Sequence, residues 1–90
     1  MAINLIFLAG GRKIFMVRIS GREIYYNDSI QGVLMLYPNP SEKVLKMFGP
    51  PTKEDLQEYE MCKDEKELMA FIIRDCKKSG AKLIKMEEIK

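Results

Sequence analysis

The stretch from Asp64 to Gly80 constrains this chain most, because it predicts a helix that is apolar over about half of its circumference. Asp64 is a typical N-cap residue, and Glu67 three positions later completes a capping box. Apolar side chains then recur over an arc of about 200°, at roughly 100° per residue. Gly80 suits the left-handed conformation that ends many helices. So wide an arc needs two partners, which we expect to be a sheet beneath the helix and a second helix beside it. The apolar residues are Leu68, Met69, Phe71, Ile72, Ile73 and Cys76.

The first part of the chain is typical of an antiparallel β-meander. Short runs rich in β-branched and aromatic residues alternate with glycine-containing turns. We expect these turns at Gly10–Gly11 and at Ser20–Gly21. The four predicted strands span residues 3–8, 13–19, 23–26 and 33–37.

After the fourth strand the pattern becomes helical. Asn39 is the expected N-cap of a first helix with Pro40 at its first position, and the Gly-Pro-Pro sequence at 49–51 ends it. Thr52 is the expected N-cap of a weaker second helix near residues 53–60. The Asp64 helix follows, and the chain closes with a predicted strand.

Together these elements predict an α+β fold in a single domain over residues 1–90. An N-terminal antiparallel β-meander of about four strands occupies residues 3–37, and two to three helices occupy residues 40–79. The last strand, at about 82–89, is expected to join the sheet beside an N-terminal strand. A chain of 90 residues buries only roughly 60–65% of its unfolded surface, so its stability is limited and oligomerisation is a common remedy.

The residue types present argue against catalysis. The chain has no histidine, the commonest general base and metal ligand, which excludes a Cys–His or Ser–His nucleophile within one chain. Two cysteines form neither a zinc set nor a disulfide framework. Cys76 lies on the apolar helix face and is expected to be an inert packed thiol. Cys62 is also interpreted as inert, with a lowered thiol pKa beside Lys63 as the alternative. We therefore expect no enzyme activity and no cofactor.

Charge and hydropathy restrict the partners. The net charge of +2 gives no strong indication of a polyanion partner. The longest apolar runs are far shorter than the roughly 20 residues that span a bilayer. We therefore expect a cytoplasmic protein with no membrane association.

The predicted hairpins leave an apolar face that three short helices would hardly cover. If Gly10 and Gly11 form a two-residue turn, Phe7 lies opposite Ile14 and shares its face. The floor beneath the helices would then be Ile6, Leu8, Phe15, Val17, Ile19, Ile24 and Tyr26, and the outer face would carry Ile3, Leu5, Phe7, Ile14, Met16 and Tyr25, with Arg18 facing Glu23.

An uncovered apolar face usually marks an interface. We therefore interpret the protein as a non-catalytic interaction module that uses this face to bind a second copy or another protein. The alternative is that a loop or the C-terminal segment folds over it. A register slip of one residue would exchange the two faces, and an uncovered apolar face would still be expected.

Two further functions remain open. A nucleic-acid-associated protein would use the basic residues of one helix and one hairpin turn, and a divalent-cation-binding protein would use an acidic helical segment. The basic candidates are Arg12, Lys13, Lys66, Arg74, Lys77 and Lys78; the acidic candidates are Glu54, Glu58 and Asp64.

Overall fold

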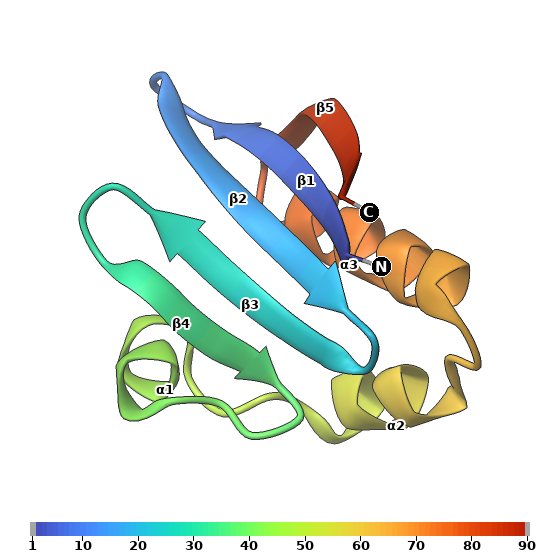
Figure 1. The fold of residues 1–90 in the computed structure, drawn as a ribbon. Coiled ribbons are helices and arrows are strands. Elements are labelled where there is room, and N and C mark those ends of the chain that lie inside the picture. Colours follow the sequence, from blue (N-terminus) through green and yellow to red (C-terminus); the bar gives the residue numbers. More distant parts are fainter. Residues whose placement is uncertain (1, 90) are drawn as a thin grey trace.

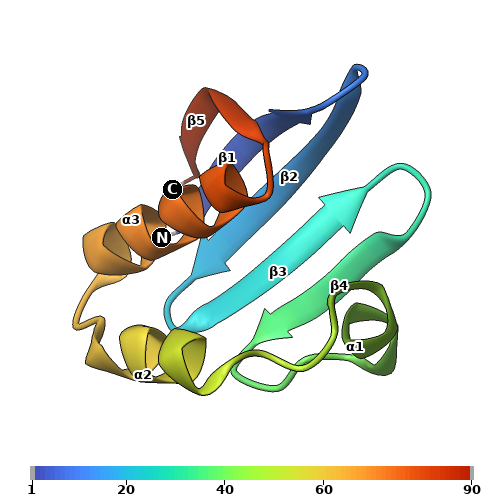
Figure 2. The same cartoon turned by 180° about the vertical axis from the view of Figure 1, so that it is seen from behind.

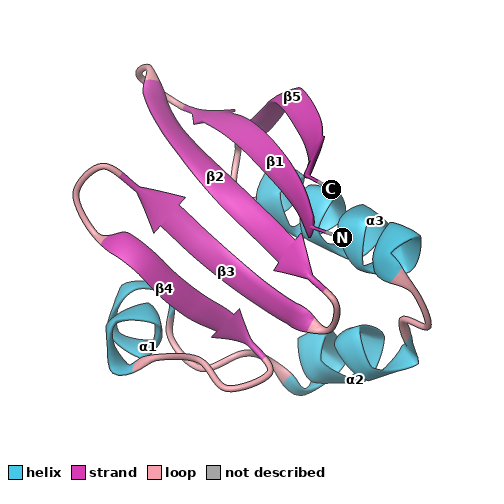
Figure 3. Ribbon diagram, in the orientation of Figure 1, coloured by secondary structure: helices cyan, strands magenta, loops and turns pink. Residues whose placement is uncertain are grey.

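The computed structural model describes residues 2–89 as one five-stranded antiparallel sheet with three helices on one of its faces (Figures 1 and 2). The strand order is β4-β3-β2-β1-β5, so the last strand pairs with the first, and the α+β layout predicted from the sequence is confirmed (Figure 3). None of the helices in this part of the chain is long and apolar enough to cross a membrane. The elements are β1 (Ala2–Ala9), β2 (Lys13–Ser20), β3 (Glu23–Asp28), β4 (Gly32–Tyr37), α1 (Glu42–Phe48), α2 (Lys53–Met61), α3 (Glu65–Lys78) and β5 (Lys82–Ile89).

The β1–β2 hairpin differs from the predicted register by one residue. Phe7 lies opposite Phe15 rather than Ile14. The turn holds three residues, Gly10–Arg12, and both Gly11 and Arg12 have a positive φ, of 80° and 81°. The third turn residue changes the parity of the pairing, so β1 presents the opposite set of side chains to each face of the sheet.

This change of register moves three predicted interface residues into the core. Ile3, Leu5 and Phe7 lie beneath the helices, with exposed fractions of 5%, 0% and 0%, so their prediction as outer-face residues was wrong. Ile6 and Leu8, predicted to lie beneath the helices, share the opposite face with Met16 and Ile14, their partners in the pairing. The two sets exchanged faces, as a slip of one residue requires.

The β2–β3 hairpin also differs from the prediction, but by an even number of residues. Its turn is formed by Gly21 and Arg22 rather than by Ser20 and Gly21, because Ser20 pairs with Glu23. Arg18 consequently lies opposite Tyr25 and not opposite Glu23. An even shift keeps every side chain on its face, so Ile14, Met16 and Tyr25 lie on the outer face as predicted.

The caps of α2 and α3 follow the sequence closely. The Asp64 carboxylate accepts a hydrogen bond from the Glu67 N–H at 2.9 Å, and Thr52 Oγ1 accepts one from the Asp55 N–H at 3.1 Å. The Glu67 carboxylate accepts a bond from the Lys63 N–H, one residue before the donor that a capping box uses. These bonds satisfy backbone donors that a helix start leaves free.

The first helix starts two residues later than its predicted cap. Ser41, not Asn39, is the N-cap of α1, and its hydroxyl accepts a hydrogen bond from the Val44 N–H at 3.3 Å. Because both residues are good N-cap types, the sequence alone does not choose between them.

The wide apolar arc of α3 meets the two partners that it requires. The helix packs against β2, β5 and α2. Leu68, Phe71 and Ile72 are buried in the main hydrophobic core together with Leu5 and Phe7 of the sheet. All three helices lie on this one side, so the opposite side of the sheet is left without a helical layer (Figures 1 and 2).

Candidate functional site

The sheet face opposite the helices carries several apolar side chains. Ile6 lies directly opposite Met16, Leu8 opposite Ile14, and Tyr25 opposite Met35. Opposed side chains share a face, so these pairs form one apolar group on β1 and β2 and another on β3 and β4, and between them Met16 lies opposite Asn27 and Arg18 opposite Tyr25. No helix of residues 2–89 lies over this face (Figure 1). We call this surface the open-face patch; it consists of Ile6, Leu8, Ile14, Met16, Tyr25 and Met35.

Charged side chains of both signs border the open-face patch. Arg18 lies beside Tyr25 in the pairing, and Glu23 precedes Tyr25 by two residues on the same face. Lys85 and Glu87 of β5 lie opposite Ile6 and Asn4, and form an ion pair with each other at 2.9 Å. The border therefore holds two positive and two negative groups, all within reach of a partner docked on the patch.

Asn4 is a buried polar residue on the same face. It is 7% exposed, and its Oδ1 has no hydrogen-bond partner among the described residues. Arg18 of β2 and Glu87 of β5 lie opposite it on the two neighbouring strands. An unsatisfied buried acceptor costs about 1–3 kcal/mol. A hydrogen-bond donor from a binding partner would remove this cost.

The six basic candidates do not form one surface. Lys66 lies at the start of α3, about 18 Å along the helix axis from Lys78 at 1.5 Å per residue. Arg74 forms an ion pair with Glu58 at 2.9 Å, and Lys13 forms one with Asp28 at 3.4 Å. Two of the candidate cations are thus partly neutralised, while Arg12 and Lys77 are exposed at different elements.

The three acidic candidates do not form a common site, because two of them make other interactions. Glu58 is paired with Arg74, Asp64 caps α3, and Glu54 is exposed in the first turn of α2. Within residues 2–89 no three histidine, cysteine or acidic side chains are grouped so that they could hold a metal ion. The structure therefore does not assemble the predicted cation site.

Both thiols are held in the protonated form. Burial raises the pKa of the Cys76 thiol to about 12, and the neighbouring Asp75 adds to the shift. Burial also raises the pKa of the Cys62 thiol, and Glu67 adds to that shift, so the lowered pKa considered for Cys62 was wrong. Because the thiolate is the nucleophile, neither cysteine is activated.

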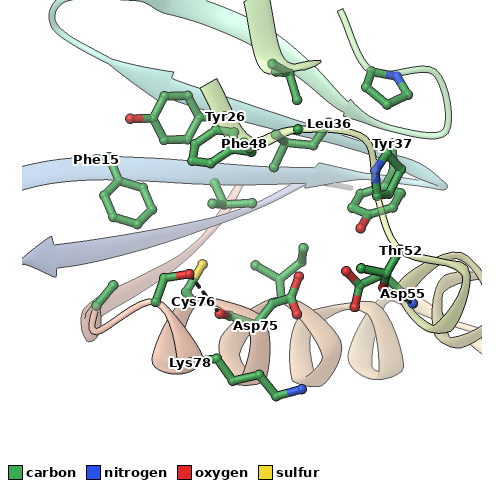
Figure 4. A pocket seen from close by; sticks show the side chains of 18 of the residues that line it. Phe15, Tyr26, Leu36, Tyr37, Phe48, Thr52, Asp55, Asp75, Cys76 and Lys78 are labelled. Carbon is green, nitrogen blue, oxygen red and sulfur yellow. Dashed lines mark hydrogen bonds between the residues drawn. The ribbon is translucent and has the colours of Figure 1, made fainter. Parts of the chain in front are cut away.

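A cleft of about 500 Å³ opens on the helix-bearing face, between α1 and α3. Its floor is formed by inner-face residues of β2 and β3, among them Phe15, Val17 and Tyr26. Figure 4 shows the Phe15 and Tyr26 rings above α3, with the Cys76 sulfur turned toward the sheet. On this face α1 packs against β4, while α3 packs against β2 and β5, and the cleft lies between the two helices.

Polar groups gather at one end of this cleft. Tyr37, Asp55 and Asp75 line it, from β4, α2 and α3 respectively. Burial raises the pKa of the Tyr37 hydroxyl, and the carboxylates of Asp55, Asp75 and Glu58 raise it further. Burial also raises the pKa of the Asp75 carboxyl, with Asp55 as the next cause. The end of the cleft is therefore electronegative and partly shielded from water.

The sequence interpretation missed this cleft, although one signal was present. Asp75 stands in the last turn of α3, where the helix dipole disfavours a negative charge. A carboxylate in that place, next to the apolar arc of the helix, contributes little to helix stability and is a hint of another role.

Comparisons of this chain with protein-family models, with curated proteins and with solved structures find no match.

Proposed function

We propose that this protein is a non-catalytic interaction module that forms a homodimer through the open-face patch. The observation that carries the proposal is the group of apolar side chains on a sheet face that no helix of residues 2–89 covers. Apolar side chains that gather on an uncovered surface are typical of protein interfaces.

The charges around the patch favour a second copy as the partner. A two-fold interface brings the same surface of both subunits together, so that surface must complement itself. Arg18 and Glu23 carry opposite charges, so each can meet the other in the second subunit, whereas Lys85 and Glu87 already pair within one chain. A partner that turned the Arg18 guanidinium toward Asn4 would also satisfy the Asn4 amide oxygen, which has no hydrogen bond in the described chain.

Substituting Met16 with lysine is expected to split the dimer. Met16 lies between Ile6 and Asn27 across the sheet, near the middle of the patch. Burying an unpaired ammonium there should raise the dimer dissociation constant by on the order of 100-fold or more. The measurement is absolute mass by light scattering behind a sizing column, at low and high salt.

The matched control is Met61→Lys, the same substitution at a methionine of α2 that is 75% exposed and lies outside the patch. It should leave the mass unchanged. A parent protein that is monomeric at every concentration and salt would disprove the homodimer. A dimer that dissociates only in high salt would show that charges, rather than the apolar patch, hold it together.

The polyanion alternative is tested in the same samples. Binding to phosphates weakens steeply with salt. Retention of the parent on a heparin column that is lost at moderate salt would therefore favour nucleic-acid binding by the basic residues.

We also propose that the protein is cytoplasmic, because its two cysteines, Cys62 and Cys76, are free thiols, as in proteins of reducing compartments.

A further inference from the structure

We propose that the cleft between α1 and α3 binds a small molecule that has an apolar body and a protonated amine. This site is separate from the open-face patch, since the two lie on opposite faces of the sheet. The cleft volume of about 500 Å³ falls within the roughly 300–1,000 Å³ of typical small-molecule sites. Such sites combine an apolar lining with a few polar groups that orient the ligand.

The floor of the cleft suits a flat apolar body. The Phe15 ring lies stacked on Phe7, with centroids 5.2 Å apart, and contacts the Tyr26 ring at 5.4 Å. Phe48 of α1 meets the edge of the Tyr26 ring at 5.6 Å and forms a side wall. These mutual contacts hold the rings in place, so the aromatic surface exists before a ligand arrives.

Among the polar groups of the cleft, the Tyr37 hydroxyl gives the clearest indication of ligand binding. Tyr37 is 7% exposed, and its ring is fixed by stacking on Tyr59 at 4.9 Å and by an edge contact with Phe71. No hydrogen bond to this hydroxyl is formed by any residue of the described chain, although it lines the cleft. Figure 4 shows it turned toward the carboxylates of Asp55, from α2, and Asp75, from α3. A hydroxyl that lines the cleft and has no protein partner is free to donate to, or accept from, a polar group of a bound molecule.

The charge at this end of the cleft selects a cation. Asp55 is accounted for by its place in the first turn of α2, where the helix dipole favours a carboxylate. Asp75 has no such explanation, and it forms no ion pair with any residue between 2 and 89, since Arg74 is paired with Glu58. A primary ammonium has three donors, which match two carboxylates and one hydroxyl oxygen.

The opposite end of the cleft does not select an anion. Lys13 lines that end, but its ammonium is paired with Asp28 at 3.4 Å. Lys78 also lines the cleft, and Figure 4 shows its side chain on the side of α3 that faces away from the sheet. A carboxylate ligand would therefore meet no free cation among these groups and would be repelled by Asp75 and Asp55.

Three probes with the same indole body test the charge preference: tryptamine, tryptophol and indole propionate carry an amine, an alcohol and an acid. The chain contains no tryptophan, so indole fluorescence in the mixture belongs to the probe alone. Tryptamine should bind at least about tenfold more tightly than tryptophol, which corresponds to one charge-assisted hydrogen bond, and the acid should bind most weakly. Equal affinity for the three probes would overturn the proposal.

Two substitutions locate the binding site. Asp75→Asn should remove most of the tenfold preference for the amine, and Tyr37→Phe should weaken tryptamine binding several-fold without lowering the urea midpoint, because its hydroxyl stabilises no other group. The matched control Glu60→Gln removes one exposed carboxylate of α2 outside the cleft and should change nothing. Met16→Lys should bind tryptamine like the parent, which keeps this test independent of dimerisation. Unchanged preference in Asp75→Asn would disprove the site.

Discussion

Replacing Phe7 with alanine is expected to lower the free energy of unfolding by about 3–5 kcal/mol. Phe7 is fully buried, stacks on Phe15 at 5.2 Å and belongs to the main core with Leu5 and Leu68. The loss combines the transfer of the ring from water with the cavity that the ring leaves behind. The measurement is the urea midpoint, with the slope checked for two-state unfolding.

Ile14→Ala is the control that makes this test specific to the hairpin register. The two-residue turn would place Ile14 opposite Phe7 on one face, whereas the structure places it opposite Leu8, on the other face and 57% exposed. Its truncation should cost less than about 0.5 kcal/mol, as surface substitutions usually do. Both variants are best made in the Met16→Lys background, so that dimerisation adds nothing to either value. Similar losses for the two would contradict the register, and Phe7→Leu replaces Phe7→Ala if the latter does not fold.

The hairpin turns explain why the fold, but not the faces of the sheet, could be predicted. Strand positions follow from local runs of β-branched and aromatic residues, and the caps at Asp64 and Thr52 depend on bonds within three residues. The face of β1 depends instead on whether Arg12 belongs to the turn. Arg12 has a positive φ of 81°, a conformation uncommon for a residue with a side chain, so a sequence pattern does not predict it.

The other features that the sequence does not predict depend on contacts between residues far apart in the chain. Arg22, which reads as a charge on an ordinary turn, donates hydrogen bonds to the backbone oxygens of Cys62 and Tyr59, and its guanidinium lies 4.6 Å from the centre of the Tyr59 ring. The cleft likewise joins Tyr37 to Asp75, residues far apart in the chain. Such pairs form only once α2 and α3 have packed on the sheet, so no local pattern reports them. An outer sheet face with apolar residues is expected in either register, but Ile3, Leu5 and Phe7, which were predicted for it, lie in the core.

Replacing Asp28 with asparagine is expected to lower the free energy of unfolding by about 1–3 kcal/mol, the cost of breaking hydrogen bonds to a buried charged group. The Asp28 side chain is 1% exposed. Its Oδ1 accepts bonds from the backbone N–H groups of Ile30 at 2.9 Å and Gln31 at 2.5 Å. Its Oδ2 accepts a bond from the Tyr26 hydroxyl at 2.5 Å and pairs with the Lys13 ammonium. An amide NH₂ in place of Oδ2 would face two donors.

The pH dependence of the unfolding free energy tests whether Asp28 acts as an ionised carboxylate or only as a neutral polar side chain. The Tyr26 hydroxyl, followed by the backbone N–H of Gln31, lowers the pKa of Asp28 from 3.8 to about 2. A lowered pKa means that the ionised group stabilises the folded state above pH 3.8, and that this stabilisation is lost as the pH falls through about 2. The parent should therefore lose stability between these values more steeply than Asp28→Asn, and Glu60→Gln should follow the parent. Parallel acid titrations of the parent and Asp28→Asn would show that Asp28 is not held ionised by these bonds.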